Sequence, residues 1–324
     1  MKILVIRFSS IGDVVLTTPV LRGLKEQIDG AEVHFLTKKA FLPIVQNNPR
    51  VDKVYTINKH INQVIGELKK ENYDFILDLH NNLRTKSVKL KLRKPSQSFS
   101  KLNWKKWLLV RFKSNRMPKI HIVERYFEAA RKLGVKNDHL PCEYYIPESD
   151  KIHVEKEFEV IPKGFVALAI GAQFATKKMP KSLLSEIIKK LKQPVILIGG
   201  PTDVDLAEEL MKEFSNNQLI NACGKYSLNQ SASIVKQSSG IITNDTGMMH
   251  IASCYDLKIV SVWGNTVPDL GMFPYSPQNE NYSIHQVEGL NCRPCSKIGF
   301  KECPKGHFDC MLKQKPEEIV SSFI

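Results

Sequence analysis

Residues 2–28, KILVIRFSSIGDVVLTTPVLRGLKEQI, decide the fold class. The run KILVIRF predicts a buried strand, and the apolar spacing from about Asp13 to Ile28 predicts a helix directly after a short polar loop. The same order of strand and helix recurs through the first half of the chain. Its further strands are predicted at VHFLT (33–37), KVYTI (53–57) and DFILDL (74–79). Strands alternating with helices predict a doubly wound parallel sheet.

The second half of the chain repeats this scheme. Its predicted strands are GFVALAIG (164–171), PVILIGG (194–200), LINAC (219–223), GIITND (240–245) and KIVSVWG (258–264). Helical patterns follow at 181–191, 203–214, 228–238 and 247–256. A chain of 324 residues is long enough for two hydrophobic cores.

The boundary between the two halves is predicted in a polar stretch. HIVERYFEAARKLG (121–134) is a helix pattern that ends at Gly134, and the polar, proline-bounded residues 148–163 follow it as a linker. We therefore predict an N-terminal Rossmann-like domain over 1–155, a C-terminal one over 156–324, and a cleft between them. In such α/β folds, ligands bind at the carboxyl ends of the strands, so the loops there are the candidate sites.

The charge of the chain predicts an anionic partner. The formal net charge is +14, and between Leu79 and Val123 there are many lysines and arginines but no acidic residue. Within this stretch, KLNWKKWLLVRF (101–112) combines basic, aromatic and apolar residues in a way that suits a segment lying on anionic lipid headgroups. A helix with a solvated basic face, packed on its own domain, explains it equally well.

The sequence also predicts the compartment. No apolar run approaches the roughly 18 residues of a membrane helix, and Arg7 and Asp13 interrupt the N-terminus where a signal peptide stays apolar. We expect a cytosolic protein with reduced cysteines, including isolated buried thiols at Cys142, Cys223 and Cys254.

Asp13 is the first candidate catalytic residue. It lies in the loop RFSSIGDVV after the first strand, where a carboxylate can accept a proton from an attacking hydroxyl. It can also simply cap the helix that begins there. The chain has neither G-x-G-x-x-G nor a P-loop motif, which argues against dinucleotide oxidoreductases and P-loop enzymes.

The second candidate is the segment GIITNDTGMMHIAS (240–253). Its strand runs straight into Asp245, Thr246 and Gly247 at the start of a helix, where free backbone amides suit a diphosphate. His250 lies on the first turn of that helix and can contact the same ligand or serve a structural role. Lys177 or Lys178, in the strand-following loop GAQFATKKMP (171–180), can reach phosphate oxygens, although surface lysines often bind nothing specific.

Two further patterns can be interpreted as metal sites. Asp203 and Asp205 in PTDVD (201–205) form a D-x-D triplet, but acids also suit the first turn of a helix. Near the C-terminus, NCRPCSKIGFKECPKGHFDC (291–310) contains four cysteines, with His307 among them. Their spacing fits a structural metal site, packed reduced thiols or a redox-labile pair. The four cysteines are Cys292, Cys295, Cys303 and Cys310.

Taken together, the motifs resemble glycosyltransferase family 9, the heptosyltransferases of lipopolysaccharide core assembly. The matching segments are 3–25, 73–86, 171–180, 196–207, 224–253 and 262–274. Most specific is the pairing of R-x-S-x-G-D in the first half with N-D-T-G-x-x-H in the second. The resemblance implies a GT-B architecture and metal-independent, inverting transfer of heptose from ADP-heptose to a Kdo–lipid A type acceptor, with no cofactor.

The resemblance also implies roles for individual residues. Asp13 would be the general base, and Asp245 would bind the heptose. Donor-binding positions are expected at Lys177, Asn221, Asp245, Thr246, Gly247, Met248, His250, Gly264 and Thr266. Acceptor-binding positions are expected at Ser9, Ser10, Gly12 and Arg84. The expected partners are an ADP-sugar and an anionic lipopolysaccharide precursor at the inner face of the cytoplasmic membrane, where the enzyme would be peripherally bound; no nucleic acid is expected.

Two departures from the family pattern bear on the substrate. Met179 stands where the family usually has tryptophan, and His80 replaces a more usual glutamine. A GT-B enzyme that uses another nucleotide sugar, or a sugar-nucleotide epimerase, therefore stays a rival hypothesis. A non-enzymatic membrane or nucleic-acid-binding protein would explain the positive charge but not the N-D-T-G loop.

Overall fold

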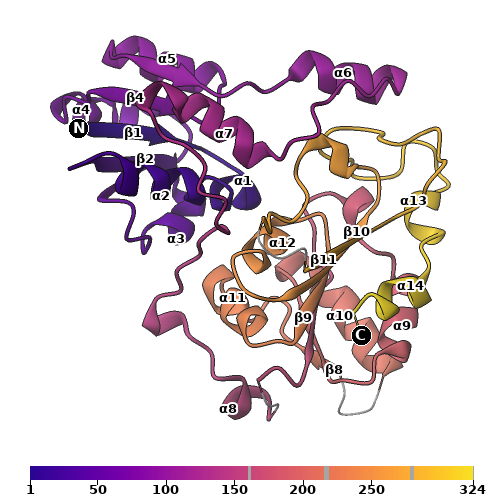
Figure 1. The fold of residues 1–324 in the computed structure, drawn as a ribbon. Coiled ribbons are helices and arrows are strands. Elements are labelled where there is room, and N and C mark those ends of the chain that lie inside the picture. Colours follow the sequence, from indigo (N-terminus) through magenta and orange to yellow (C-terminus); the bar gives the residue numbers. More distant parts are fainter. Residues whose placement is uncertain (160–161, 215–218, 278–280, 324) are drawn as a thin grey trace. The chain divides into compact units, whose positions relative to one another are not determined.

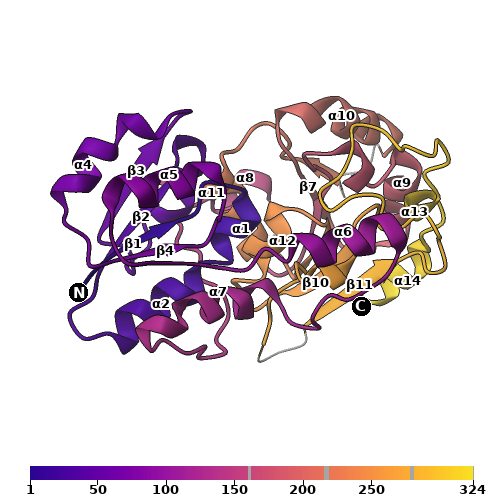
Figure 2. The same cartoon turned by 90° about the horizontal axis from the view of Figure 1, so that it is seen from above.

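The computed structural model describes residues 1–159, 162–214, 219–277 and 281–323 and divides the chain into two compact units (Figures 1 and 2). The first unit comprises Met1–Lys101 and Ile120–Tyr145. The second comprises Leu102–Lys119 and the chain from Ile146 onward. Each unit contains one parallel sheet. Of the predicted linker, residues 160–161 lie outside the described part of the chain.

This division differs from the predicted boundary between residues 155 and 156. Residues 102–119 come from the first half of the sequence but pack on the second unit. Leu109 is buried with Val267 and Leu270, and the Lys113 ammonium donates to the backbone carbonyl of Pro294 at 2.7 Å. These contacts join residues that lie far apart in the sequence, so local patterning could not reveal them.

The first unit has a five-stranded sheet in the order β3-β2-β1-β4-β5, with all neighbouring strands parallel. Its strands are β1 (Lys2–Ile6), β2 (Glu32–Lys38), β3 (Lys53–Ile57), β4 (Phe75–Asp78) and β5 (Ser96–Ser98). The strands at 33–37, 53–57 and 74–79 are confirmed as β2, β3 and β4. The short edge strand β5 was not predicted, because its sequence, SQS, lacks apolar residues.

Helices cover both faces of this sheet. Side chains of α4 and α5 pack against one face together with Leu4, Ile6 and Ile76, while α2 and α7 pack together on the other side (Figure 2). The helices are α1 (Ile11–Val15), α2 (Thr18–Gln27), α3 (Leu42–Val45), α4 (Ile65–Lys70), α5 (Leu83–Leu92) and α7 (Ile122–Ala130), with 3-10 turns at Lys39–Phe41, Ile61–Gln63 and Arg131–Leu133.

The continuous helix predicted from Asp13 to Ile28 is wrong. The chain forms α1 and α2 with a break at Leu16–Thr17. Pro19 occupies the first turn of α2, where its missing N–H costs nothing, whereas a continuous helix would need that N–H to bond to the Val15 carbonyl. The helix at 121–134 is confirmed: α7 and a 3-10 turn end at Gly134, which adopts φ +76°.

The second unit has a six-stranded parallel sheet in the order β11-β10-β9-β6-β7-β8. Its strands are β6 (Val166–Ala169), β7 (Val195–Ile198), β8 (Leu219–Asn221), β9 (Gly240–Asn244), β10 (Lys258–Trp263) and β11 (Tyr282–Gln286). The first five confirm the predicted strands of the second half. The edge strand β11, YSIHQ, was missed because all its residues are half-buried and its pattern is weak.

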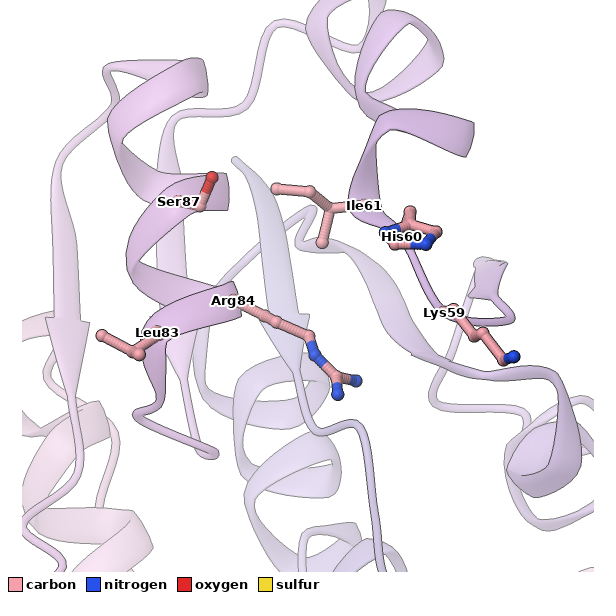
Figure 3. A pocket seen from close by; sticks show the side chains of 6 residues that line it. All are labelled: Lys59, His60, Ile61, Leu83, Arg84 and Ser87. Atoms are coloured by element: carbon pink, nitrogen blue, oxygen red, sulfur yellow. The ribbon is translucent and has the colours of Figure 1, made fainter.

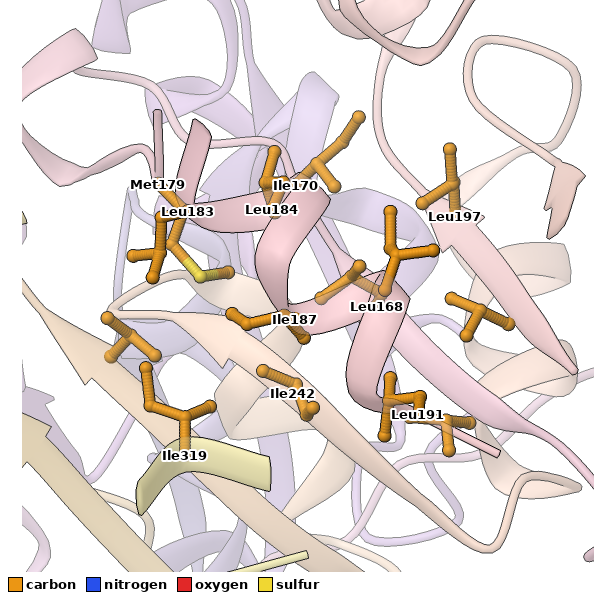
Figure 4. Close-up of a cluster of buried hydrophobic side chains, with 14 of the residues drawn as sticks. Leu168, Ile170, Met179, Leu183, Leu184, Ile187, Leu191, Leu197, Ile242 and Ile319 are labelled. Carbon is orange, nitrogen blue, oxygen red and sulfur yellow. The ribbon is translucent and has the colours of Figure 1, made fainter. Parts of the chain in front are cut away.

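Two hydrophobic cores flank this sheet. Val166 and Leu168 of β6 point into a core with α9 and α10, whereas Ala167 and Ala169 point into a core with α11 and α12 (Figure 4 shows the first core). Because both faces are buried, the strand is apolar throughout. The helices of this unit are α6 (Asn103–Phe112), α8 (Val154–Phe158), α9 (Lys181–Lys190), α10 (Val204–Glu213), α11 (Leu228–Lys236), α12 (Gly247–Ala252), α13 (Asp309–Leu312) and α14 (Pro316–Ser321), with 3-10 turns at Glu148–Asp150, Ala175–Lys177, Pro201–Asp203 and Pro268–Leu270.

The predicted linker is partly structured. It contains α8, whose Val154 is fully buried in the core formed with α11 and α12. Among the described residues, none of the helices is long and apolar enough to cross a bilayer.

We predict that Leu184→Ala lowers the free energy of unfolding of the second unit by about 2–5 kcal/mol, the usual cost of a cavity at a fully buried leucine. Denaturant unfolding measures this. The matched control is Leu312→Ala, at a leucine that is 55% exposed, and we expect it to change stability by no more than about 0.5 kcal/mol. Equal effects of the two substitutions would contradict the assigned core.

Candidate active site

Asp13 belongs to a network of hydrogen bonds in the loop that follows β1. Its Oδ1 lies 2.6 Å from Nη2 of Arg7, and its Oδ2 accepts from the backbone N–H of Ser10 at 3.1 Å and from the Ser10 hydroxyl at 2.8 Å. Arg7 also donates to the carbonyl of Leu79 at 2.5 Å, which ties this loop to the end of β4. The loop is thus held by one buried guanidinium.

The structure also shows Asp13 capping α1, which is the alternative role that the sequence allowed. Ser10 is the N-cap of α1, and Asp13 is the third helical residue, whose side chain reaches back to the N-cap amide. Capping does not bury the carboxylate, because the side chain is still 18% exposed. Burial is the largest influence on Arg7 and opposes its charge, but Asp13, together with Tyr126 and Asp78, outweighs burial and raises the pKa of Arg7. Asp13 therefore has a cationic partner and a carboxylate that is still partly exposed.

His80 follows β4 and lies near this network, close enough for Arg7 and Asp13 to act on its charge. Its ring meets that of Phe8 edge-on, with 5.4 Å between the centroids. Burial, with the positive charges of Arg7 and Lys101, lowers the pKa of His80 to about 4. The imidazole is therefore neutral near pH 7. A neutral imidazole carries one donor and one acceptor, so, like the amide of glutamine, it can both donate and accept a hydrogen bond.

Arg84 lies beside an open depression of about 590 Å³ in the first unit. Figure 3 shows Leu83, Arg84 and Ser87 of α5 on one side and Lys59, His60 and Ile61 on the other. Arg84 and Lys59 place two positive charges there. A depression lined by cations suits a phosphorylated or carboxylated ligand. Lys59 and His60 were missed in the sequence because they lie outside the recognised motifs.

In the second unit, Asp245, Lys177 and Thr266 meet. Asp245 directly follows β9, and its Oδ2 accepts from the Lys177 ammonium at 2.5 Å and from the Thr266 hydroxyl at 2.7 Å. These residues come from the loops after β6, β9 and β10, which parallel pairing brings to one edge of the sheet. The structure therefore brings together three of the expected donor-site residues.

The start of α12 presents further expected donor-site residues. Thr246 is the N-cap, and Gly247 and Met248 are half-buried in the first turn. His250 is only 2% exposed, so its side chain is turned into the unit. Contact between His250 and a ligand stays a prediction.

Asn244 and Met179 have structural roles next to this site. The Asn244 side chain is buried, donates to the carbonyl of Ala169 at 3.3 Å and accepts from the N–H of Met179 at 3.1 Å. Met179 itself is 1% exposed and packs in the core with α9. Met179 at this position therefore contributes to the core of the second unit.

Asn221 and Gly264 have local structural roles as well. Asn221 ends β8, and its side-chain oxygen accepts from the backbone N–H of Cys223 at 2.9 Å. At Gly264, a Cβ atom would lie 2.6 Å from the carbonyl oxygen of Thr176, so any side chain would push apart the loops that carry Lys177 and Thr266.

Arg293 stabilises the loops of this site through hydrogen bonds, and the sequence analysis did not identify it. It is 9% exposed, and its guanidinium donates to the carbonyls of Gly264 at 2.6 Å, Thr266 at 2.9 Å and Val287 at 2.7 Å. Burial lowers its pKa. The sequence signal that could have pointed to Arg293 is its position between two cysteines in C-R-P-C, where an arginine is an unusual neighbour.

Burial first, and then the neighbouring thiols of Cys292 and Cys303, raise the pKa of Cys295, so these three C-terminal thiols lie close to one another. Sγ of Cys292 lies 3.9 Å from Nε2 of His307, but Cys310 is buried in the core with α9, which raises the pKa of its thiol to about 12. In the described residues, the group of three potential ligands within 4.8 Å of one another is Glu32, His34 and Glu71.

Other titratable groups are paired. The ammonium groups of Lys2 and Lys53 already pair with Glu71, so the Glu32, His34 and Glu71 group is an ion-pair network. The Asp203 carboxylate accepts from the N–H of Gly200 and pairs with Lys178 at 2.5 Å, which makes it part of a helix start. Asp205 is exposed on α10.

The isolated thiols fit the prediction only in part. Cys142 and Cys223 are buried, whereas Cys254 is half-buried, with its Sγ 3.4 Å from the carbonyl oxygen of His250. All seven cysteines are free thiols.

Comparison with known proteins identifies the class. Two parallel-sheet α/β units of this kind form the GT-B architecture of glycosyltransferases, and solved structures of that fold superpose on this chain. A glycosyl transferase of family 9 from Veillonella parvula gives a TM-score of 0.77 at 20% identity, covering 99% of this chain and 95% of the other. The ADP-heptose LPS heptosyltransferase II of E. coli gives 0.75 at 19% identity, covering 99% and 97%.

The sequence comparisons give the family. The model of glycosyltransferase family 9 (heptosyltransferase) matches residues 61–304, so the chain belongs to this family and is a glycosyltransferase. The lipooligosaccharide heptosyltransferase 2 of Haemophilus ducreyi is 24% identical, over 99% of this chain and 97% of that protein. The lipopolysaccharide heptosyltransferase 2 of E. coli is likewise 24% identical, over 99% and 97%.

We predict that His80 makes folding sensitive to acid. Its folded-state pKa is about 4 and its ordinary value is 6.5, so the unfolded chain takes up the proton more readily. The stabilisation is full above pH 6.5 and is lost as the pH falls towards 4, by up to about 3 kcal/mol. Unfolding of wild type and His80→Gln between pH 7.5 and 4 measures this. The wild type should lose more stability than the variant, and parallel curves would contradict the assignment.

We predict that Arg293→Met weakens donor binding without unfolding the unit, because the loop that carries Thr266 loses its buried donors. Without these donors the loop is no longer held in place and must be ordered again when the ligand binds, so we expect the ADP affinity to fall at least about tenfold. Calorimetric titration with ADP measures this. The matched control is Arg116→Met, at an exposed arginine of the same unit. Unchanged ADP affinity in Arg293→Met would show that the hydrogen bonds of Arg293 do not affect ligand binding.

Proposed function

We propose that this enzyme transfers heptose from ADP-heptose to the inner core of lipopolysaccharide, on a Kdo–lipid A type acceptor, with inversion at the anomeric carbon and without a metal ion. The family and the heptosyltransferase relatives support the transfer of heptose. The observation that carries the mechanism is the Asp13 carboxylate, which is partly exposed and ion-paired with Arg7 in the loop after β1.

In this mechanism Asp13 is the general base. As the acceptor oxygen attacks the anomeric carbon, its proton passes to the Asp13 carboxylate. The bond between that carbon and the diphosphate oxygen breaks, and ADP leaves from the opposite face with the electron pair. A positioned base of this kind typically contributes about 10²–10⁴-fold in rate.

The donor residues would act on the leaving group. Negative charge grows on the diphosphate as the bond breaks, so the Lys177 ammonium and the amides of Thr246, Gly247 and Met248 would stabilise the transition state more than the ground state. Asp245, held by Lys177 and Thr266, would accept hydrogen bonds from sugar hydroxyls. Asn221, His250 and Gly264 would complete the nucleotide site.

The first unit would bind the acceptor. Ser9, Ser10 and Gly12 surround the proposed base, and Arg84 lines the basic depression with Lys59. Such cations suit the carboxylates and phosphates of an inner-core acceptor. Since that acceptor is anchored in lipid, we further propose a cytoplasmic enzyme bound peripherally to the inner membrane.

Asp13→Asn tests the base. We expect turnover of ADP-heptose, measured as ADP release in the presence of EDTA, to fall by about 10²–10⁴-fold while ADP affinity stays within about twofold. The control is Asp29→Asn, at an exposed aspartate of the same unit. Turnover of Asp13→Asn within tenfold of wild type would refute the role of Asp13. No turnover by the wild type with this donor would instead favour a GT-B enzyme for another nucleotide sugar.

A further inference from the structure

Helix α6 exposes an aromatic face made of Trp104, Trp107 and Phe112. These side chains are 67%, 46% and 60% exposed. The two tryptophan rings stack with 4.8 Å between their centroids, and Phe112 meets Trp107 edge-on at 5.1 Å. Three large aromatic side chains gathered on one helix and left in water are costly for a protein surface, and such patches usually mark an interaction site.

The surroundings of this aromatic face are basic. Lys105 and Arg111 are exposed on the same helix, and Arg116 and Lys119 follow it within seven residues. No acidic residue occurs in the sequence from 79 to 123. A cationic rim around aromatic side chains complements anionic headgroups, with the rings at the level where headgroups meet acyl chains.

The opposite side of α6 fixes the helix to the second unit. Leu109 packs on Val267 and Leu270, and beyond the helix the Asn115 amide pairs with Asp269 at 2.5 Å. The aromatic residues lie outside this buried cluster and stay largely exposed. A rigidly held helix can present its aromatic face without first folding on its target, so it loses little entropy on binding.

We propose that the aromatic face of α6 docks on the surface of an anionic lipid bilayer, with Trp104, Trp107 and Phe112 in the interface and the lysines and arginines on lipid phosphates. This inference rests on the proposed function only for the membrane at which the enzyme works. It adds the surface that binds the membrane, and this surface belongs to the unit that carries Asp245 and Lys177.

Tryptophan fluorescence tests the docking directly. The chain has three tryptophans, and the third, Trp263, is 1% exposed, so a change in emission on adding vesicles reports on α6. We expect a blue shift with vesicles of phosphatidylglycerol and phosphatidylethanolamine, quenching by brominated acyl chains, and little response to pure phosphatidylcholine. No shift with anionic vesicles would overturn the proposal.

Variants of α6 separate docking on lipid from binding to nucleic acid. We expect Trp104→Ser with Trp107→Ser to lower vesicle binding by sedimentation at least about tenfold, and Lys105→Glu with Arg111→Glu to lower it about fivefold per charge. The matched control, Leu312→Ser, changes an exposed apolar residue elsewhere on the same unit and should bind as wild type does. Stronger binding to single-stranded nucleic acid than to vesicles would overturn the assignment to lipid.

An activity measurement distinguishes this proposal from the proposed function. The tryptophan variant should keep wild-type turnover on a soluble, deacylated acceptor and lose turnover on an acceptor embedded in vesicles. Vesicle binding needs neither donor nor acceptor, so it can succeed even if the enzyme uses another sugar. Equal turnover of variant and wild type on the embedded acceptor would contradict docking through this face.

Discussion

Parallel pairing of the strands is the constraint on which the rest of the structure depends. Every strand in both sheets runs in the same direction as its neighbours, so the loops that follow the strands collect at one edge of each sheet. Asp13, His80 and Arg84 follow β1 and β4 in the first unit. Lys177, Asp245 and Thr266 follow β6, β9 and β10 in the second. Residues distant in sequence therefore meet without any local signal joining them.

At these edges of the two sheets, ion pairs determine which side chains remain available for chemistry. Arg7 and Ser10 bind Asp13 but leave its carboxylate partly exposed. Lys177 and Thr266 hold Asp245 in a similar way, whereas Lys178 and Gly200 engage Asp203 in a helix start. The same residue types thus serve the proposed chemistry in one loop and local structure in the next.

The sequence predicted the strands and the motif loops because both carry local signals. Val166–Ala169 is apolar at every position, and Asp13 and Asp245 stand shortly after such runs. The edge strands β5 and β11 lack such signals and were missed, and other failures depended on long-range packing. Nothing near residues 102–119 indicates that they join the second unit, and the role of Arg293 emerges only when its guanidinium meets the carbonyls of Gly264 and Thr266. The low pKa of His80 likewise needs the buried neighbourhood of Arg7.

The decisive measurement is the structure of the product that the wild-type enzyme forms from ADP-heptose and a Kdo–lipid A acceptor in EDTA. Proton and carbon NMR of the isolated product would give the identity of the new sugar and the configuration at its anomeric carbon. We expect one heptose, joined with the anomeric configuration opposite to that of the donor. A product with retained configuration, or turnover that stops when metal is removed, would contradict direct displacement assisted by Asp13.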